Sequence, residues 1–300
     1  MAKYKIMSFD GGGIRGALSA KILERLVDYE PALLENVNLL AGTSSGAFIA
    51  LGLAYGLKPP ELVELYSMKN GRFIFTPEYS EILRPKYNNE HLKEVLGSIF
   101  PPDLKLKDLK KQVLIPVFCL NDAQTNAWNP VFLHNCSHSD FLEMPVLDAA
   151  LASSAAPIYF PSYQNYIDGG VVANNPSTAA IAFARDEAAG NQPLDDICLL
   201  SVSTGYSPAK ITEDTTDWGA LEWMLSFSPP IPLLTILLDS AVEADTYYSR
   251  QLLGKHYFRI NPLLPKSIYL DDYNQIPALL SLAKKYHLKP ALNWLRANWY

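Results

Sequence analysis

The sequence predicts an α/β fold built on a largely parallel sheet. Segments with the apolar pattern of buried strands alternate along the chain with segments of helical periodicity, which is typical of layered α/β domains. The chain has 300 residues, of which 49% are apolar and 19% charged, so it can bury a substantial core. No internal repeat or low-complexity linker divides it. We therefore expect one domain over residues 1–300.

The individual elements follow from apolar runs and from glycine and proline signals. A helix over residues 47–57 is apolar on all sides, which predicts that it is buried in the core. From about Pro208 the chain becomes rich in tryptophan, leucine, isoleucine and proline, and we interpret residues 208–253 as a cap over the active edge of the sheet. Strands are predicted over residues 4–9, 37–41, 113–120, 131–134, 163–168 and 197–203, and further helices over residues 16–29, 145–153, 233–253 and 271–289.

The composition excludes several classes of function. A formal net charge of −6 is unlike the basic surface of a nucleic-acid-binding protein. The three cysteines, Cys119, Cys136 and Cys198, are far apart and form no Cys-x-x-Cys pair. This spacing predicts buried, reduced thiols and argues against a disulfide framework or a zinc site.

The chain shows no targeting or membrane-spanning segment. The apolar run near residue 6 is too short for a secretory signal and leads at once into an acid and three glycines. Its longest strongly apolar stretch, residues 229–238, is broken by prolines and is half of the roughly 20 residues that a spanning helix needs. We expect a cytoplasmic or non-classically secreted protein that could still contact a membrane surface peripherally.

The segment Gly42-Thr43-Ser44-Ser45-Gly46 fits the pattern Gly-x-Ser-x-Gly. It follows an apolar strand and opens a helix, which is the setting of a nucleophile elbow, and this makes Ser44 the candidate nucleophile. Ser45 would present its amide, and not its hydroxyl, to a substrate. An ordinary strand-to-helix turn is the alternative for this motif alone.

The glycine-rich turn Asp10-Gly11-Gly12-Gly13-Ile14-Arg15-Gly16 lies between the first strand and the first helix. A phosphate-binding loop fits poorly. The turn has no Gly-Lys-Ser/Thr ending, and no acidic residue ends a second strand about 20 positions further on. The amides of Gly11, Gly12 and Gly13 instead suit an oxyanion hole beside Ser44. Arg15 could steady the turn, meet a lipid phosphate or form a surface salt bridge.

A serine nucleophile needs a base, and Asp168 is the candidate. It ends a strand and is followed by Gly169-Gly170, and ligands bind at strand ends in parallel sheets. A carboxylate can serve only if partial desolvation raises its proton affinity. The histidines occupy no glycine-rich or loop-end position; they are His91, His134, His138, His256 and His287.

Together these blocks resemble the patatin-like phospholipase family. The resemblance rests on the glycine turn, the elbow, Ala152-Ser153-Ser154-Ala155-Ala156-Pro157 with Tyr159-Phe160-Pro161, and Asp168-Gly169-Gly170, in the family's order. It implies a three-layer α/β/α sandwich, a dyad of Ser44 and Asp168, and an oxyanion hole at the triple glycine. The site would be shaped by Arg15, Pro157, Gly169 and Gly170.

The resemblance also implies hydrolysis of acyl esters of phospholipids, lysophospholipids or related glycerolipids, with no metal and no cofactor. Residues 208–253 would then suit an acyl-chain groove or an interfacial patch, with a plain hydrophobic core as the alternative. Two rivals stay open: an α/β-hydrolase-type esterase with a Ser-His-Asp triad, and a non-enzymatic storage or effector protein on the same fold.

Overall fold

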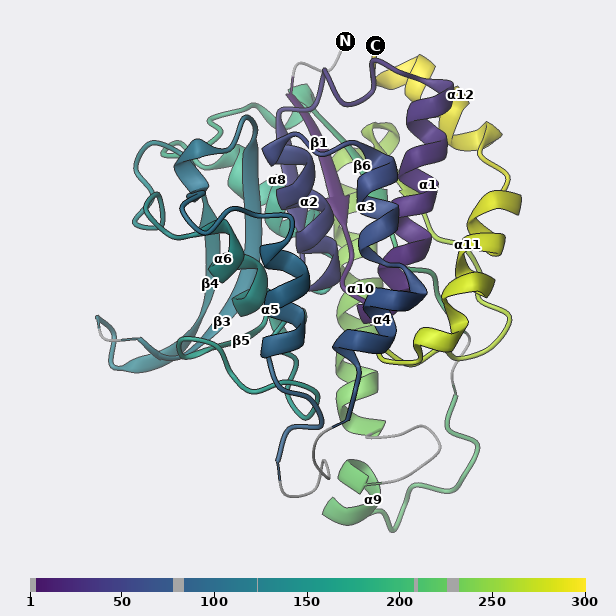
Figure 1. Cartoon of the computed structure of the whole chain (residues 1–300). Helices are drawn as coiled ribbons and strands as arrows, with labels where there is room; N and C mark the ends of the chain where they lie inside the picture. The colour runs from purple at the N-terminus through teal and green to yellow at the C-terminus, as the bar shows by residue number, and fades with distance from the viewer. Residues whose placement is uncertain (1–3, 78–83, 123, 208–209, 226–231) are drawn as a thin grey trace.

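The computed structural model describes residues 4–77, 84–122, 124–207, 210–225 and 232–300 (Figure 1). Within them, six strands of a seven-stranded sheet follow the order β4-β3-β2-β1-β6-β7, and β5 pairs with β3 beside this path. The strands are β1 (Tyr4–Phe9), β2 (Leu39–Gly42), β3 (Gln112–Asp122), β4 (Ala127–His134), β5 (Tyr166–Asp168), β6 (Ile197–Val202) and β7 (Tyr257–Ile260).

The sheet is mostly parallel, as predicted. β1 runs parallel to β2 and β6, β2 to β3, and β6 to β7, whereas β4 and β5 are antiparallel to β3. β3 pairs through Gln112 with Leu39 of β2 and farther along through Val117 with Asp168 of β5. Because β2 and β5 follow each other on the same side of β3, Asp168 lies beyond the carboxyl end of β2.

Helices cover both faces of the sheet, which confirms the three-layer arrangement (Figure 1). Alternate residues of β1 point to opposite faces, so Met7 and Phe9 pack into one cluster and Tyr4 and Ile6 into the other. The Phe9 face carries α1 (Gly16–Tyr29), α2 (Ser45–Tyr55), α6 (Val146–Ser153) and α11 (Ile276–Lys285); the opposite face carries α8 (Ser177–Arg185) and α10 (Pro232–Leu253).

Several short elements were not predicted from the sequence. Their apolar runs are too brief to show a period, and β7 has only four residues. They are α3 (Pro59–Leu65), α4 (Met68–Ile74), α5 (Glu90–Gly97), α7 (Gly170–Ala173), α9 (Ala220–Leu225), α12 (Lys289–Asn298) and β7. The helix over residues 47–57 is confirmed as the buried α2, although it begins at Ser45.

Two predicted elements are divided or shortened in the structure. The single helix expected over residues 271–289 was wrong, because Tyr286 leaves the helical conformation (φ −59°, ψ 135°) and Pro290 lies in the first turn of a separate helix, α12. The strand expected over residues 163–168 shortens to β5, since Gln164 and Asn165 adopt positive φ angles of 48° and 66° in a turn.

All three cysteines are buried and free, as the spacing predicted. In the part of the chain that the structure describes, no helix combines the length and the apolarity that crossing a bilayer would require.

Candidate active site

Ser44 occupies a sharp turn between β2 and α2. Its backbone is in a strained region, with φ 53° and ψ −124°, and strain of this kind in a non-glycine residue is typical of functional sites. The flanking glycines make the turn possible. A Cβ atom on Gly42 would lie 2.2 Å from the Gly46 carbonyl oxygen, and one on Gly46 would lie 2.2 Å from the Phe9 carbonyl oxygen. The elbow therefore packs directly against the end of β1.

Side chains from other elements hold this elbow in place. The Thr43 hydroxyl donates to the Ala173 carbonyl at 2.5 Å. The Ser44 amide donates to the Ser153 hydroxyl at 3.0 Å, and that hydroxyl donates to the Pro116 carbonyl at 2.8 Å. Ser153 was quoted only as part of a sequence block, and its contact with Ser44 depends on how α6 packs beside β3.

Asp168 is in contact with Ser44. Its carboxylate accepts a hydrogen bond from the Gly170 amide at 2.6 Å, and the Ser44 side chain lies close enough to lower the pKa of that carboxylate. The residue is 7% exposed, and burial raises its pKa to about 6 against the opposing effect of these two groups. The structure thus supplies the desolvated setting that a carboxylate base requires.

The two glycines after Asp168 have distinct roles. A Cβ atom on Gly169 would lie 2.0 Å from the Pro116 carbonyl oxygen, so only glycine fits where β5 meets β3. Gly170 begins α7, and its amide binds the Asp168 carboxylate. These contacts keep Asp168 close to Ser44 and limit its side-chain freedom.

The glycine turn lies against the elbow, but its three amides are not equivalent. A Cβ atom on Gly11 would lie 3.2 Å from Ser44 Cβ. The Gly11 amide, however, donates to the Asn174 carbonyl at 2.9 Å, so Gly11 is not available as an oxyanion donor and its prediction is corrected. Among the described residues, the Gly12 and Gly13 amides have no acceptor. They remain the predicted donors.

Arg15 contacts the turn itself. Its Nε donates to the Gly12 carbonyl at 3.4 Å, which fits the expectation that it steadies the turn. Gly13 has φ +57°, and a Cβ atom there would lie 2.2 Å from the Leu270 carbonyl oxygen. Only glycine therefore permits this approach of the turn to the Leu270 loop.

The short helix α7 links the three parts of the site. Its first amide binds Asp168, and the carbonyls at its end accept hydrogen bonds from Thr43 of the elbow and from Gly11 of the turn. Asn174 belongs to none of the sequence motifs described above. Its role depends on a backbone carbonyl, and a backbone group leaves no signal in residue type.

An apolar pocket extends from Ser44 on the face that carries α2. It holds about 680 Å³ of empty space, part of it open to solvent. Pro157 does not line it, although its neighbours Ser154 and Ala156 do. Its apolar walls come from α2 to α5 and from the segments near residues 160 and 276; they include Phe48, Leu65, Ile74, Phe75, Leu92, Phe160 and Ile276.

The role of residues 208–253 as an acyl groove stays a prediction, and none of the described residues within that region lines this pocket. The physical reason is the side of the sheet on which α10 packs. α10 contacts α8, β6 and β7 on the opposite face; it also packs against α7, where a Cβ atom on Gly170 would lie 3.5 Å from Leu238. Its role as a cap stays a prediction.

The chain is similar to a protein family and to several known proteins. The family model for "Patatin-like phospholipase" matches residues 7–181. The chain is 38% identical to protein teg of Priestia megaterium and 38% identical to CotR of Bacillus subtilis, in both cases over all of this chain and at least 99% of the relative. It is 32% identical to a cGAMP-activated phospholipase of Vibrio cholerae over 67% of this chain and 64% of that protein. VipD of Legionella pneumophila, a solved structure, matches 94% of this chain and 67% of its own with 12% identity and a TM-score of 0.42.

The chain therefore belongs to the patatin-like phospholipase family. At the level of that family it is a lipid acyl hydrolase, with a lipid as its substrate.

Proposed function

We propose that the protein is a phospholipase A or lysophospholipase that cleaves fatty-acyl esters through a dyad of Ser44 and Asp168. The observation that carries this proposal is the interaction of the Ser44 side chain with a buried carboxylate whose pKa is raised to about 6. No histidine lines the pocket around Ser44, although the structure describes all five. The carboxylate is thus the base available to Ser44.

The proposed reaction has two halves. Asp168 takes the proton of Ser44 as Oγ attacks the ester carbonyl, and the amides of Gly12 and Gly13 stabilise the resulting oxyanion. The ester C–O bond then breaks, and Asp168 gives its proton to the leaving alcohol. Water next attacks the acyl-enzyme, Asp168 takes the water proton, and the fatty acid leaves as the proton returns to Ser44.

The pocket supports an acyl chain as the group that remains on the enzyme. Its walls are almost wholly apolar, and burial of each methylene from water contributes about 0.8 kcal/mol. The leaving headgroup would then face the open side of the site. Peripheral contact with a lipid surface is part of this proposal, and exposed leucines of α9 and α10 support it, namely Leu221, Leu233 and Leu237.

A panel of phospholipids, lysophospholipids and neutral glycerolipids, read by mass spectrometry, tests the proposal. The wild type should release fatty acid, and Ser44→Ala and Asp168→Asn should lose almost all turnover while remaining folded. A fluorophosphonate probe should label the wild type and not Ser44→Ala. Ser98→Ala is a matched control, because its hydroxyl bonds only to the Val95 carbonyl at the end of α5.

The two alternative functions, a Ser-His-Asp esterase and a non-enzymatic protein, predict different results. Replacing each histidine in turn should leave hydrolysis intact; a folded histidine variant without activity would favour a Ser-His-Asp triad. A folded wild type that neither hydrolyses lipid nor takes the probe would favour a non-enzymatic protein on this fold.

A further inference from the structure

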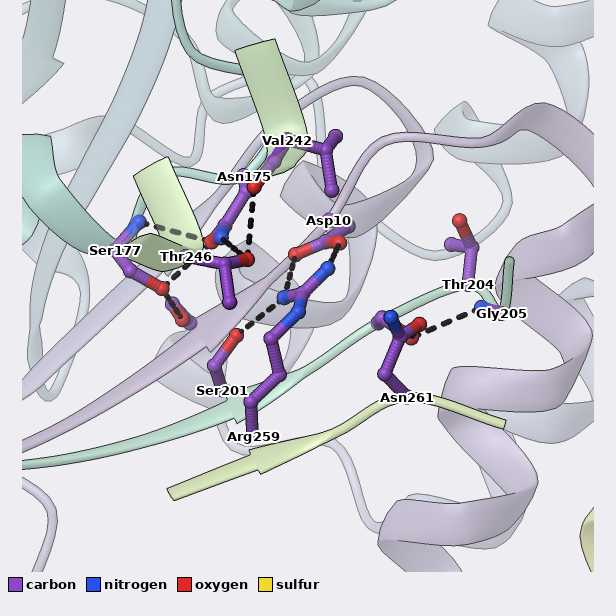
Figure 2. A network of polar contacts seen from close by, with 12 residues as sticks. Asp10, Asn175, Ser177, Ser201, Thr204, Gly205, Val242, Thr246, Arg259 and Asn261 are labelled. Carbon is purple, nitrogen blue, oxygen red and sulfur yellow. Dashed lines mark hydrogen bonds and ion pairs between the residues drawn. The ribbon is translucent and has the colours of Figure 1, made fainter. Parts of the chain in front are cut away.

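A buried ion pair lies at the start of the glycine turn, on the sheet face that α8 and α10 cover. Arg259 of β7 donates to both carboxylate oxygens of Asp10, at 3.0 and 2.5 Å, and to the Ser201 hydroxyl at 2.7 Å (Figure 2). The two charged side chains are 4% and 2% exposed. Asp10 is the residue directly before Gly11, so the ion pair ends where the turn begins.

The sheet register explains how the last strand reaches the first. Ser8 of β1 pairs with Ser201 of β6, which pairs with Arg259 of β7. Asp10 follows Ser8 by two residues, and side chains two residues apart in a strand point to the same face of the sheet. Because the side chain at Ser201 is small, the guanidinium can extend over β6 and reach Asp10 (Figure 2).

Other contacts hold the turn on both sides of its two unpaired amides. The Asp10 amide donates to the Val202 carbonyl at 3.2 Å, and the Thr204 hydroxyl donates to the Gly11 carbonyl at 3.0 Å. After the glycines, the Ile14 amide donates to the Leu270 carbonyl at 2.9 Å. Arg259 adds the contact that holds the Asp10 side chain, at the point where the backbone leaves β1.

A contribution to folding stability does not by itself explain why this buried ion pair is present. Replacement of a buried ion pair by apolar side chains of similar volume is often neutral or stabilising. Here the Arg259 Nε is buried without a partner among the described residues, so the pair is not fully satisfied. Burial raises the pKa of Asp10, and the Arg259 guanidinium opposes this effect.

Charge gives a stronger reason. An Asp10 carboxylate without a cation would place a negative charge beside the amides that receive the oxyanion in the proposed mechanism, and like charges repel in a buried site. The Arg259 guanidinium neutralises that carboxylate and fixes its direction with two parallel hydrogen bonds.

We infer that Arg259 is a positioning residue for ester hydrolysis, which sets the Gly12 and Gly13 amides by clamping Asp10. The inference rests on the proposed function for its catalytic consequence. Arg259 lies outside residues 7–181, the part that the family model matches.

Two measurements on the full chain test the inference. The first is hydrogen exchange of the peptide that covers residues 10–15, which does not depend on activity. The second is turnover of an oxoester against its thionoester, because sulfur accepts weaker hydrogen bonds and a thionoester depends less on the oxyanion amides. Misplaced amides therefore lower the oxoester-to-thionoester ratio, whereas partial unfolding lowers both rates together.

The main variants are Arg259→Met, which removes the charge, and Arg259→Lys, which keeps it without the two parallel bonds. Leu295→Ala is the matched control for lost stability, because it truncates a fully buried side chain in α12. Arg296→Met is the control for a lost arginine ion pair, here with Glu30. If Arg259→Met does not fold, Asp10→Asn/Arg259→Met removes both charges and takes its place.

Arg259→Met should exchange faster over residues 10–15 and lose about 10²-fold in kcat for the oxoester with KM little changed, the effect of losing an oxyanion donor. In both exchange and turnover, Arg259→Lys should fall between Arg259→Met and the wild type. Both controls should keep the oxoester-to-thionoester ratio of the wild type. Unchanged exchange, or an unchanged ratio with full turnover, overturns the inference. If the wild type shows no Ser44-dependent hydrolysis, the proposed function fails, and the exchange result alone decides whether Arg259 positions the turn.

Discussion

The Asp168 carboxylate interacts with the Ser44 side chain, which lowers the pKa of that carboxylate, and accepts a hydrogen bond from the Gly170 amide at 2.6 Å. Ser44 follows β2, and Asp168 ends β5, and both strands pair with β3. β3 therefore brings the two residues together, although they are distant in sequence. The burial of Asp168 has consequences for pH dependence and for stability.

Activity should depend on pH through Asp168. A general base works as the carboxylate, and burial raises its pKa to about 6, so kcat/KM should be low below this pH and rise to a plateau above it. A pH profile on a water-soluble ester, in the wild type and in His134→Gln, measures this. A midpoint that disappears in the histidine variant would contradict the assignment to Asp168.

Asp168→Asn should increase stability at neutral pH while activity is lost. The folded-state pKa of Asp168 is raised from 3.8 to about 6. Its ionisation therefore costs the folded protein no stability below pH 3.8, and the cost develops as the pH rises from 3.8 through 6. A shift of this size corresponds to at most about 3 kcal/mol at pH 7. Thermal melts of both proteins at acid and neutral pH measure the difference.

The control for that comparison is Asp122→Asn. The Gln124 amide and other hydrogen bonds lower the pKa of Asp122, so its loss should not stabilise the protein at neutral pH. A wild type as stable as Asp168→Asn at every pH would argue against a desolvated carboxylate at position 168.

Gly46→Ala should disrupt the elbow. The added methyl group would lie 2.2 Å from the Phe9 carbonyl oxygen and 2.6 Å from that of Asp10, and neither backbone group can move without displacing β1. We expect a loss of about 2 kcal/mol or more in unfolding free energy, together with most of the turnover. Gly97→Ala, at a position with no atom within 4 Å of the added carbon, should change neither. Denaturant unfolding and ester turnover measure both variants, and a fully active, stable Gly46→Ala would show that the elbow tolerates a side chain there.

Added bulk in the apolar pocket should shift the preferred acyl chain. Leu92 is 4% exposed and lines the pocket from α5, so Leu92→Trp should fill space that a long chain would use. We expect hydrolysis of a palmitoyl ester to fall about tenfold or more relative to a butyryl ester, since several methylenes lose burial worth about 0.8 kcal/mol each. Trp294→Phe, on α12 outside the pocket lining, is the control, and an unchanged chain preference in Leu92→Trp would place the acyl chain elsewhere.

Much of the fold could be predicted because its longest elements carry strong local patterns. The first strand and the first helix were predicted with the bounds that the structure has, and α10 to within one residue. The helix expected over residues 271–289 was wrong because two short amphipathic helices share a similar period, and only the backbone at Tyr286 separates them. The elements α3 to α5 went unpredicted, yet they build much of the pocket wall.

The sequence by itself determined the candidate nucleophile, the candidate base and the glycine turn, because each needs a particular residue type at a chain turn. Only the tertiary structure decided which amides are unpaired, since hydrogen bonding of the Gly11 amide depends on where the Asn174 carbonyl lies. It likewise placed the pocket on the α2 face and brought Arg259 to Asp10 across β6. Backbone contacts and cross-strand register join residues that are far apart in the chain, so no local pattern records them.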